Sequence, residues 1–323
     1  MKVNIFTEAG NNIGWGHVSR CLALYEELID REIEVQMIIY GEFNHHRMLD
    51  GFDYIKADWK KREFLERFQF KNSYAIVDSY QADFDTYKYI SDNTLKSLFI
   101  DDTNRLEYPS GIVLNPSFYV DNLNYKAREN LEYIFGEEYI ILRKAFRQNI
   151  KRINKQSLET VLIAFGGIDR KNYTIRVLDI LTSNFPKIKL NVVINSEKEN
   201  LYQNYKNNPN VKLFQNLSSQ EMLNLYLASD FCIAAASQTV LELIATNTPF
   251  FPVSTEINQS NILDNLIYIY NIQMIDLNTN GWEPKLIDVV DSAISQYKNM
   301  VVPNLPIIDG VENIFNELFY GDK

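Results

Sequence analysis

His17 is the residue of this sequence best placed to move a proton. It follows Gly14 and Gly16 in a loop between an expected first strand (residues 3–6) and an expected helix (residues 18–30). Glycine lets a backbone approach a ligand closely, and an imidazole takes up and releases protons near neutral pH. We predict that His17 is a general base; hydrogen bonding to a ligand and a packing role are the alternatives.

Four carboxylates lie at or just beyond the ends of expected strands. Glu8 and Asp78 follow neighbouring strands, and either could orient the imidazole of His17 by accepting its other N–H. Asp101 and Asp102 end another strand, where we expect them to cap a helix or bind a hydroxyl group. No second group of acids or histidines follows at metal-ligand spacing, so we predict neither a metal nor another cofactor.

A second set of small and polar residues suits a phosphate group. Gly166 and Gly167 follow the first expected strand of the second half of the chain. A glycine pair before a helix can hold a diphosphate, or it can simply form a loop. Ser237 occupies the N-cap position of another expected helix, where the backbone N–H groups of Gln238 and Thr239 would point at an anion.

Glu242 lies in the first turns of that same helix. Its carboxylate could accept two hydrogen bonds from a ribose diol, or it could face solvent and complement the helix dipole. Asn258 and Gln259 follow the next expected strand, where they could bind sugar hydroxyls or cap a helix. His45 and His46 lie in a polar loop that we interpret as surface.

Short apolar runs and amphipathic stretches alternate along the chain. This pattern predicts an α/β fold of two doubly wound, Rossmann-like units with parallel strands and crossover helices. A polar, basic stretch near residues 148–157 indicates a linker, so we assign one domain to residues 1–150 and a second to residues 151–323. The amphipathic segment 311–320 is expected to form a last helix that packs on either domain. Because ligands bind at the carboxyl ends of parallel strands, the polar loops would face a cleft.

The composition argues against several classes of partner. Lys and Arg total 32 against 42 Asp and Glu, and the net charge of −10 disfavours nucleic acid and anionic membranes. The longest apolar runs, such as 161–165 and 231–236, are too short to span a bilayer, and residues 1–7 resemble a strand more than a signal peptide. Two cysteines are too few for a disulfide scaffold. We expect a cytoplasmic protein without an integral membrane segment, and a monomer is favoured.

The glycine loop carries a recognisable pattern. Residues 14–24, GWGHVSRCLAL, resemble the G-x-G-H-x-x-R-C-L-x-L signature of PseG, the nucleotide-sugar hydrolase family of pseudaminic acid biosynthesis, to which SpsG is related. The second half of the chain is similar to MurG-type glycosyltransferases of the GT-B fold. Looser similarities to PseG follow in the same order at Asp78, Asp101-Asp102, Leu114-Asn115, Leu142-Arg143, Gly166-Gly167-x-Asp169, Ser237 to Glu242 and Asn258-Gln259.

This resemblance implies a GT-B-like architecture with a UDP-sugar as substrate and no metal. By analogy, His17 would activate water for inverting attack on the anomeric carbon, Asp78 and Tyr80 would assist catalysis, and UDP would be released. The family substrate is UDP-2,4-diacetamido-2,4,6-trideoxy-β-L-altropyranose. The sugar would contact Glu8, Gly14, Gly16, Arg20, Asn258 and Gln259. The nucleotide would contact Gly166, Gly167, Ser237, Gln238, Thr239 and Glu242.

Two positions depart from the family pattern. Residues 6–8 are Phe-Thr-Glu where the family has R-x-D, and residues 78–80 are Asp-Ser-Tyr where it has D-H-Y. Both positions would face the sugar, so transfer of the sugar to a surface-glycan acceptor is an alternative to hydrolysis. An apolar and basic stretch near residues 60–70 would suit such a transferase at a membrane. A non-catalytic nucleotide-sugar binding protein and a 2-epimerase are further alternatives.

Overall fold

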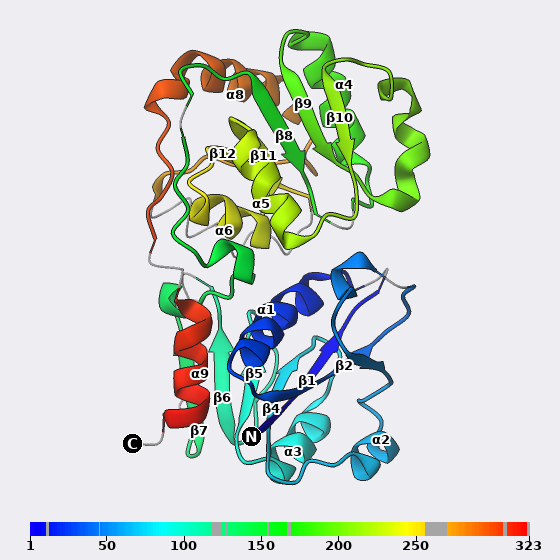
Figure 1. Ribbon diagram of the computed structural model, residues 1–323, viewed down its shortest axis with the longest axis vertical. Helices are drawn as coiled ribbons and strands as arrows, with labels where there is room; N and C mark the ends of the chain where they lie inside the picture. Colours follow the sequence, from blue (N-terminus) through cyan, green and yellow to red (C-terminus); the bar gives the residue numbers. More distant parts are fainter. Residues whose placement is uncertain are drawn as a thin grey trace. The chain divides into compact units, whose positions relative to one another are not determined.

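The chain consists of two compact units. The computed structural model describes residues 1–10, 13–44, 46–117, 125–126, 128–153, 155–166, 169–255, 270–305 and 309–321. The first unit comprises Met1–Arg147 together with Pro306–Lys323, and the second comprises Gln148–Leu305. Figure 1 shows the first unit in blue through cyan to blue-green with the last helix in red, and the second unit in green to orange.

The described residues of the first unit form a seven-stranded parallel sheet in the order β3-β2-β1-β4-β5-β6-β7. Its strands are β1 (Lys2–Glu8), β2 (Glu34–Tyr40), β3 (Tyr54–Lys56), β4 (Ser73–Asp78), β5 (Ser97–Ile100), β6 (Gly111–Asn115) and β7 (Leu131–Phe135). Its helices are α1 (Gly16–Asp30), α2 (Arg62–Arg67), α3 (Phe84–Asn93) and α9 (Gly310–Tyr320).

Both faces of this sheet are buried, because side chains of β1 alternate between two cores. Val3 and Ile5 pack with the apolar faces of α1 and α9, and the last helix therefore belongs to the first unit. Phe6 packs on the opposite face with residues of α2 and α3. A strand buried on both sides carries apolar residues on both of its faces, and β1 does so although it also buries Asn4 and Thr7.

The described residues of the second unit repeat the plan with six parallel strands, in the order β10-β9-β8-β11-β12-β13. The strands are β8 (Thr160–Ala164), β9 (Lys189–Val193), β10 (Val211–Phe214), β11 (Phe231–Ala235), β12 (Phe250–Ser254) and β13 (Ile275–Asp276). Helices α4 (Tyr173–Asn184) and α8 (Trp282–Gln296) share one core on this sheet. Helices α5 (Ser219–Ala228) and α6 (Gln238–Ala245) contact β8, β11 and β12. The predicted pair of doubly wound units is confirmed.

In both sheets the strand order reverses beside the first strand. The reversal lies between β1 and β4 in the first unit and between β8 and β11 in the second. Chain segments that leave these two strands turn to opposite faces, which opens space at their carboxyl ends. The loops after β1 and β4, and after β8 and β11, are therefore where each unit can hold a ligand.

Two elements lie where the sequence analysis placed none. Strand β7 falls inside a polar stretch and forms a sheet edge, with the side chains of Leu131, Glu132 and Tyr133 only half-buried. Helix α8 buries Trp282 and Leu286 but also contains several charged residues and a proline. Within the described residues, no helix is both long and apolar enough to cross a membrane.

Candidate functional site

The loop between β1 and α1 is tight and leaves the helix start open. Gly10 and Gly14 exchange backbone hydrogen bonds, and Gly14 has a φ of 93°, which favours glycine. Helix α1 then begins at Gly16 with no side chain capping it and no acidic residue in its first turn. A side chain at Gly16 would meet only open space. This local fold places His17 in the first turn of α1, at the carboxyl end of β1.

His17 is held by a buried carboxylate and a guanidinium. Its Nδ1 lies 2.7 Å from Oδ1 of Asp78, which is the last residue of β4 and is fully buried. Arg20, one turn further along α1, donates from Nε to Oδ2 of Asp78 at 2.5 Å and from Nη2 to Oδ1 at 2.6 Å. A charged Asp78 can only accept, so we assign the proton of this contact to Nδ1, which leaves the lone pair of a neutral imidazole on Nε2.

A second carboxylate lies on the other side of the imidazole. Glu8 ends β1, is fully buried, and places Oε1 3.9 Å from Nε2 of His17. Oε1 also accepts the backbone N–H of Tyr80 at 2.9 Å, and Oε2 accepts the hydroxyl of Ser79. The two positions that depart from the PseG pattern therefore contact each other. Phe6, which we expected to face the sugar, instead packs in the core against Trp59 and other aromatic rings.

Asp102 completes the arrangement from the loop after β5. Its Oδ2 accepts from Nη1 of Arg20 at 2.9 Å, and its Oδ1 accepts the hydroxyl of Tyr80 at 2.5 Å. The ring of Tyr80 stands perpendicular to that of His17, with centroids 4.4 Å apart. Asp101 turns away and accepts backbone N–H groups of its own loop. Asp102 thus accepts a protein hydroxyl and also forms an ion pair with Arg20, which the sequence analysis did not expect.

These groups carry more negative than positive charge. Burial alone disfavours a charged Asp78, but Arg20 and then His17 outweigh it and hold the pKa of this carboxyl well below its usual range. Burial opposes ionisation of Asp102 as well, and Arg20 again lowers its pKa. Burial, and next the neighbouring Asp102, raises the pKa of the Tyr80 phenol well above its ordinary value. A positive charge that develops near His17 would therefore be stabilised.

In the second unit, the start of α4 already holds an anion from the protein itself. Asp169 accepts the backbone N–H groups of Tyr173 and Thr174 at 2.8 and 2.7 Å. Gly166, before this turn, is exposed, has a φ of 81°, and has open space beside its Cα. The loop after β8 thus offers a ligand an exposed glycine, whereas the helix N–H groups beyond it are occupied.

The start of α6 is different, because its cap is a hydroxyl and not a carboxylate. Ser237 is the N-cap, as predicted, and its hydroxyl accepts the N–H of Thr239. The first turn contains no acidic residue. Glu242 is buried, with 3% of its surface exposed, and its Oε2 accepts the hydroxyl of Tyr226 at 3.0 Å. A partly exposed helix start and a fixed carboxylate therefore lie within two turns of one helix.

Most, but not all, of the predicted residues lie either in the network around His17 or in the loop after β8 and the helix α6. In the first unit, Glu8, His17, Arg20, Asp78 and Tyr80 form one network beside Gly14 and Gly16. Sequence reasoning missed the ion pair of Asp102, although acids at the ends of adjacent strands were a signal for it. Four predicted positions lie outside the described residues, namely His45, Gly167, Asn258 and Gln259.

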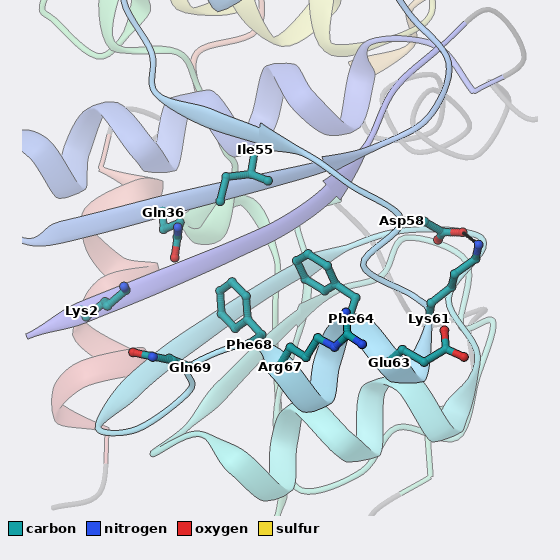
Figure 2. A pocket seen from close by; sticks show the side chains of 10 residues that line it. All are labelled: Lys2, Gln36, Ile55, Asp58, Lys61, Glu63, Phe64, Arg67, Phe68 and Gln69. Carbon is teal, nitrogen blue, oxygen red and sulfur yellow. Dashed lines mark ion pairs between the residues drawn. The ribbon is translucent and has the colours of Figure 1, made fainter.

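Other parts of the first unit look less like a reaction site. His46, interpreted as surface, is half-buried, with its ring 4.3 Å from that of Trp15. A pocket of about 600 Å³ opens among β1, β2, β3 and α2, where Phe64 and Phe68 line it together with charged residues (Figure 2). None of the predicted site residues lines this pocket. Among the described residues, no group of three or more His, Cys, Asp or Glu side chains is placed to hold a metal ion.

Known proteins of similar sequence include one with a defined reaction. No protein-family model matches the chain. An uncharacterised protein of Methanocaldococcus jannaschii is 27% identical over 98% of this chain and 67% of its own length. The UDP-2,4-diacetamido-2,4,6-trideoxy-β-L-altropyranose hydrolase of Campylobacter jejuni is 26% identical over 81% of this chain and 94% of its own length. The chain is therefore a distant relative of a UDP-sugar hydrolase.

Solved structures of similar fold are GT-B proteins. MurG of Acinetobacter baumannii matches with a TM-score of 0.61 at 14% identity, over 98% of this chain and 99% of its own. The S. aureus MnaA–UDP co-structure matches with a TM-score of 0.64 at 10% identity, over 99% of this chain and 96% of its own. At such identities the likeness concerns the fold, and it agrees with the two Rossmann-like units. The GT-B-like fold class predicted from the sequence is confirmed.

Proposed function

We propose that this protein hydrolyses a UDP-linked deoxy amino sugar at the anomeric C1–O bond and releases UDP. The observation that carries the proposal is the His17–Asp78 pair, which leaves Nε2 of His17 as a base beside an open helix start. The distant relationship to a UDP-sugar hydrolase supports this choice of reaction. The substrate would be UDP-2,4-diacetamido-2,4,6-trideoxy-β-L-altropyranose or a close analogue.

The reaction we propose needs one proton transfer and one displacement. Water attacks the anomeric carbon as its proton passes to Nε2 of His17, and the C1–O electron pair leaves with the phosphate oxygen of UDP. The imidazolium that forms is stabilised by Asp78 at Nδ1 and by Glu8 beyond Nε2. The same excess of carboxylates favours the positive charge that develops on a sugar ring when its anomeric bond breaks.

We assign the nucleotide to the second unit. The start of α6 would hold the diphosphate through backbone N–H groups near Ser237, Gln238 and Thr239, because a helix N-terminus attracts anions. Glu242 would accept hydrogen bonds from the ribose, and its bond to Tyr226 fixes the carboxylate for that task. The glycine at position 166 would let the backbone approach the same nucleotide.

Hydrolysis in oxygen-18 water tests the proposal. Purified protein incubated with UDP-linked 2,4-diacetamido sugars should release UDP and a free sugar, and mass spectrometry should find the label in the sugar. Label in the phosphate would instead mean cleavage of the P–O bond. No release of UDP from a panel of nucleotide sugars would contradict the hydrolase proposal.

Sugar transfer remains the second candidate because of Glu8 and Ser79. These two residues differ in type from those of the hydrolase pattern, and they contact each other at the proposed sugar side of the site. A transferase would release UDP only when an acceptor hydroxyl is present, and it would place no solvent label in the product. The same labelling experiment with and without an acceptor glycan separates the two reactions.

A further inference from the structure

Asp102 connects the guanidinium of Arg20 with the hydroxyl of Tyr80. Each of its carboxylate oxygens accepts from one of these side chains, Oδ2 from Nη1 of Arg20 at 2.9 Å and Oδ1 from Tyr80 at 2.5 Å. Both partners in turn contact His17 or the carboxylate that holds it. Asp102 itself is one step removed from His17, so its effect on the imidazole must pass through these two side chains.

The first route passes through Arg20 to Asp78. Nη2 of Arg20 and Nδ1 of His17 approach the same oxygen of Asp78, at 2.6 and 2.7 Å. Because a guanidinium is planar and rigid, fixing Nη1 on Asp102 also fixes the two N–H groups that face Asp78. Asp102 therefore sets how Arg20 and His17 share that oxygen.

The second route passes through the ring of Tyr80. This ring stands perpendicular to the imidazole at 4.4 Å, yet 39% of the Tyr80 surface is exposed. Surrounding packing therefore covers only part of this side chain. The bond from its hydroxyl to Asp102 supplies the anchor that keeps the ring against His17.

We propose that Asp102 is a positioning residue, which holds Arg20 and Tyr80 so that the imidazole of His17 keeps a single orientation. Nε2 is then presented in the same direction in every molecule. The catalytic benefit of this arrangement rests on the proposed hydrolysis, whereas the positioning of His17 does not. The two parts can therefore be tested apart.

The positioning is measured by NMR of the histidine imidazoles, without substrate. The chain has three histidines, so the His17 signals are assigned by their loss in His17→Ala. Asp102→Asn keeps one acceptor oxygen in place of two, so the side chain can no longer accept from both Arg20 and Tyr80. We expect the chemical shifts of the His17 imidazole to move most of the way to the values measured in Tyr80→Leu, the reference variant that lacks the aromatic ring. Asp102→Glu keeps two acceptors and should restore them in large part. Unmoved His17 signals in Asp102→Asn would overturn the proposal.

Two further variants control the measurement. Asp92→Asn removes the same charge from an exposed ion pair with Lys88 on α3, and it should leave the His17 signals unchanged. Tyr80→Phe removes only the anchoring hydroxyl, and it carries the test if Asp102→Asn does not fold. We expect Tyr80→Phe to displace the His17 signals toward those of Tyr80→Leu, and unmoved signals would equally overturn the proposal.

The catalytic part is measured on a UDP-sugar that wild-type protein turns over. We expect Asp102→Asn to lower kcat about tenfold while KM changes by less than about twofold, because a misaligned base slows the chemical step and not binding. Asp102→Glu should recover most of kcat. A loss confined to KM would contradict the positioning role. A wild-type protein without turnover would contradict the proposed function and leave the NMR result standing.

Discussion

The two loop regions at the strand-order reversals share a topology but differ in charge. Between β1 and β4, buried carboxylates surround His17 and one guanidinium, so the region favours a proton or a developing cation. Between β8 and β11, a hydroxyl and backbone N–H groups form the start of α6, which favours an anion. The carboxylates of the first region thus surround one histidine and one guanidinium, whereas in the second region Asp169 already binds the start of α4 and a hydroxyl caps the start of α6.

Among the substitutions that test this difference between the two regions, removal of the proposed base should have the largest effect. We expect His17→Ala to lower kcat about 100-fold or more and to leave UDP affinity within about twofold, because the proposed base and the proposed nucleotide site belong to different units. Steady-state kinetics and titration calorimetry with UDP measure the two quantities. A matching loss of UDP affinity would mean that His17 binds the nucleotide and would remove the contrast.

Removing the charge of Asp78 should make the first unit less stable in a pH-dependent way. We expect Asp78→Asn to lose about 3 kcal/mol of unfolding free energy at neutral pH, because the buried Arg20 keeps only Asp102 as a charged partner. The lowered pKa of Asp78 means that its contribution is present above about pH 4, the unfolded value, and is lost as the pH falls further.

Urea unfolding of both proteins at pH 7 and at pH 3 measures this difference. The gap between wild type and Asp78→Asn should be smaller at pH 3 than at pH 7. A gap that stays constant, or that widens in acid, would show that the charge of Asp78 does not stabilise the fold.

At the proposed nucleotide site, Glu242→Ala should have the opposite effect to His17→Ala, with a loss of UDP affinity and little change in kcat. UDP affinity should fall about tenfold, since a ribose would lose its hydrogen-bond acceptors, while kcat at saturating substrate stays within about threefold. Calorimetry with UDP and with uracil separates a ribose contact from a general loss of the pocket. Unchanged UDP affinity would remove Glu242 from the proposed site.

The smallest effect compares two serine caps of the second unit. Ser218 forms a capping box with Glu221 at the start of α5, and Ser237 caps α6. Each change to Ala should cost about 1 kcal/mol of stability. Only Ser237→Ala should also weaken UDP binding, by about two- to fivefold. Equal UDP affinity in the two variants would argue against a phosphate at the start of α6.

Much of the architecture could be predicted because most buried strands and helices have a characteristic spacing of apolar residues in the sequence. Buried parallel strands give short apolar runs, and helices such as α1 and α5 give a 3.6-residue period, which in α5 follows a recognisable serine cap. Strand β7 gave no such run, because an edge strand with half-buried side chains needs few apolar residues. Helix α8 does bury Trp282, Leu286 and Val290 at helical spacing, but acids and a proline among them obscured the period.

Candidate residues could be singled out from the sequence where one residue type limits the chemistry. His17 stood out because histidine is rare in this chain and because it follows glycines at a strand end. Asp101 and Asp102 could not be told apart, since which acid faces the site depends on where β5 stops. The backbone N–H of Asp101 still pairs with Leu114 of β6, and the chain then turns, so that Asp102 faces Arg20.

The contact between Glu8 and Ser79 has a consequence for how this protein can be altered. Both oxygens of Glu8 are engaged by one short segment, the hydroxyl of Ser79 and the amide of Tyr80. Placing histidine at position 79 alone would remove that hydroxyl and leave one oxygen of a carboxylate without exposed surface short of a donor. The effects of substitutions at positions 8 and 79 should therefore depend on each other, so a double substitution should not equal the sum of the two single ones.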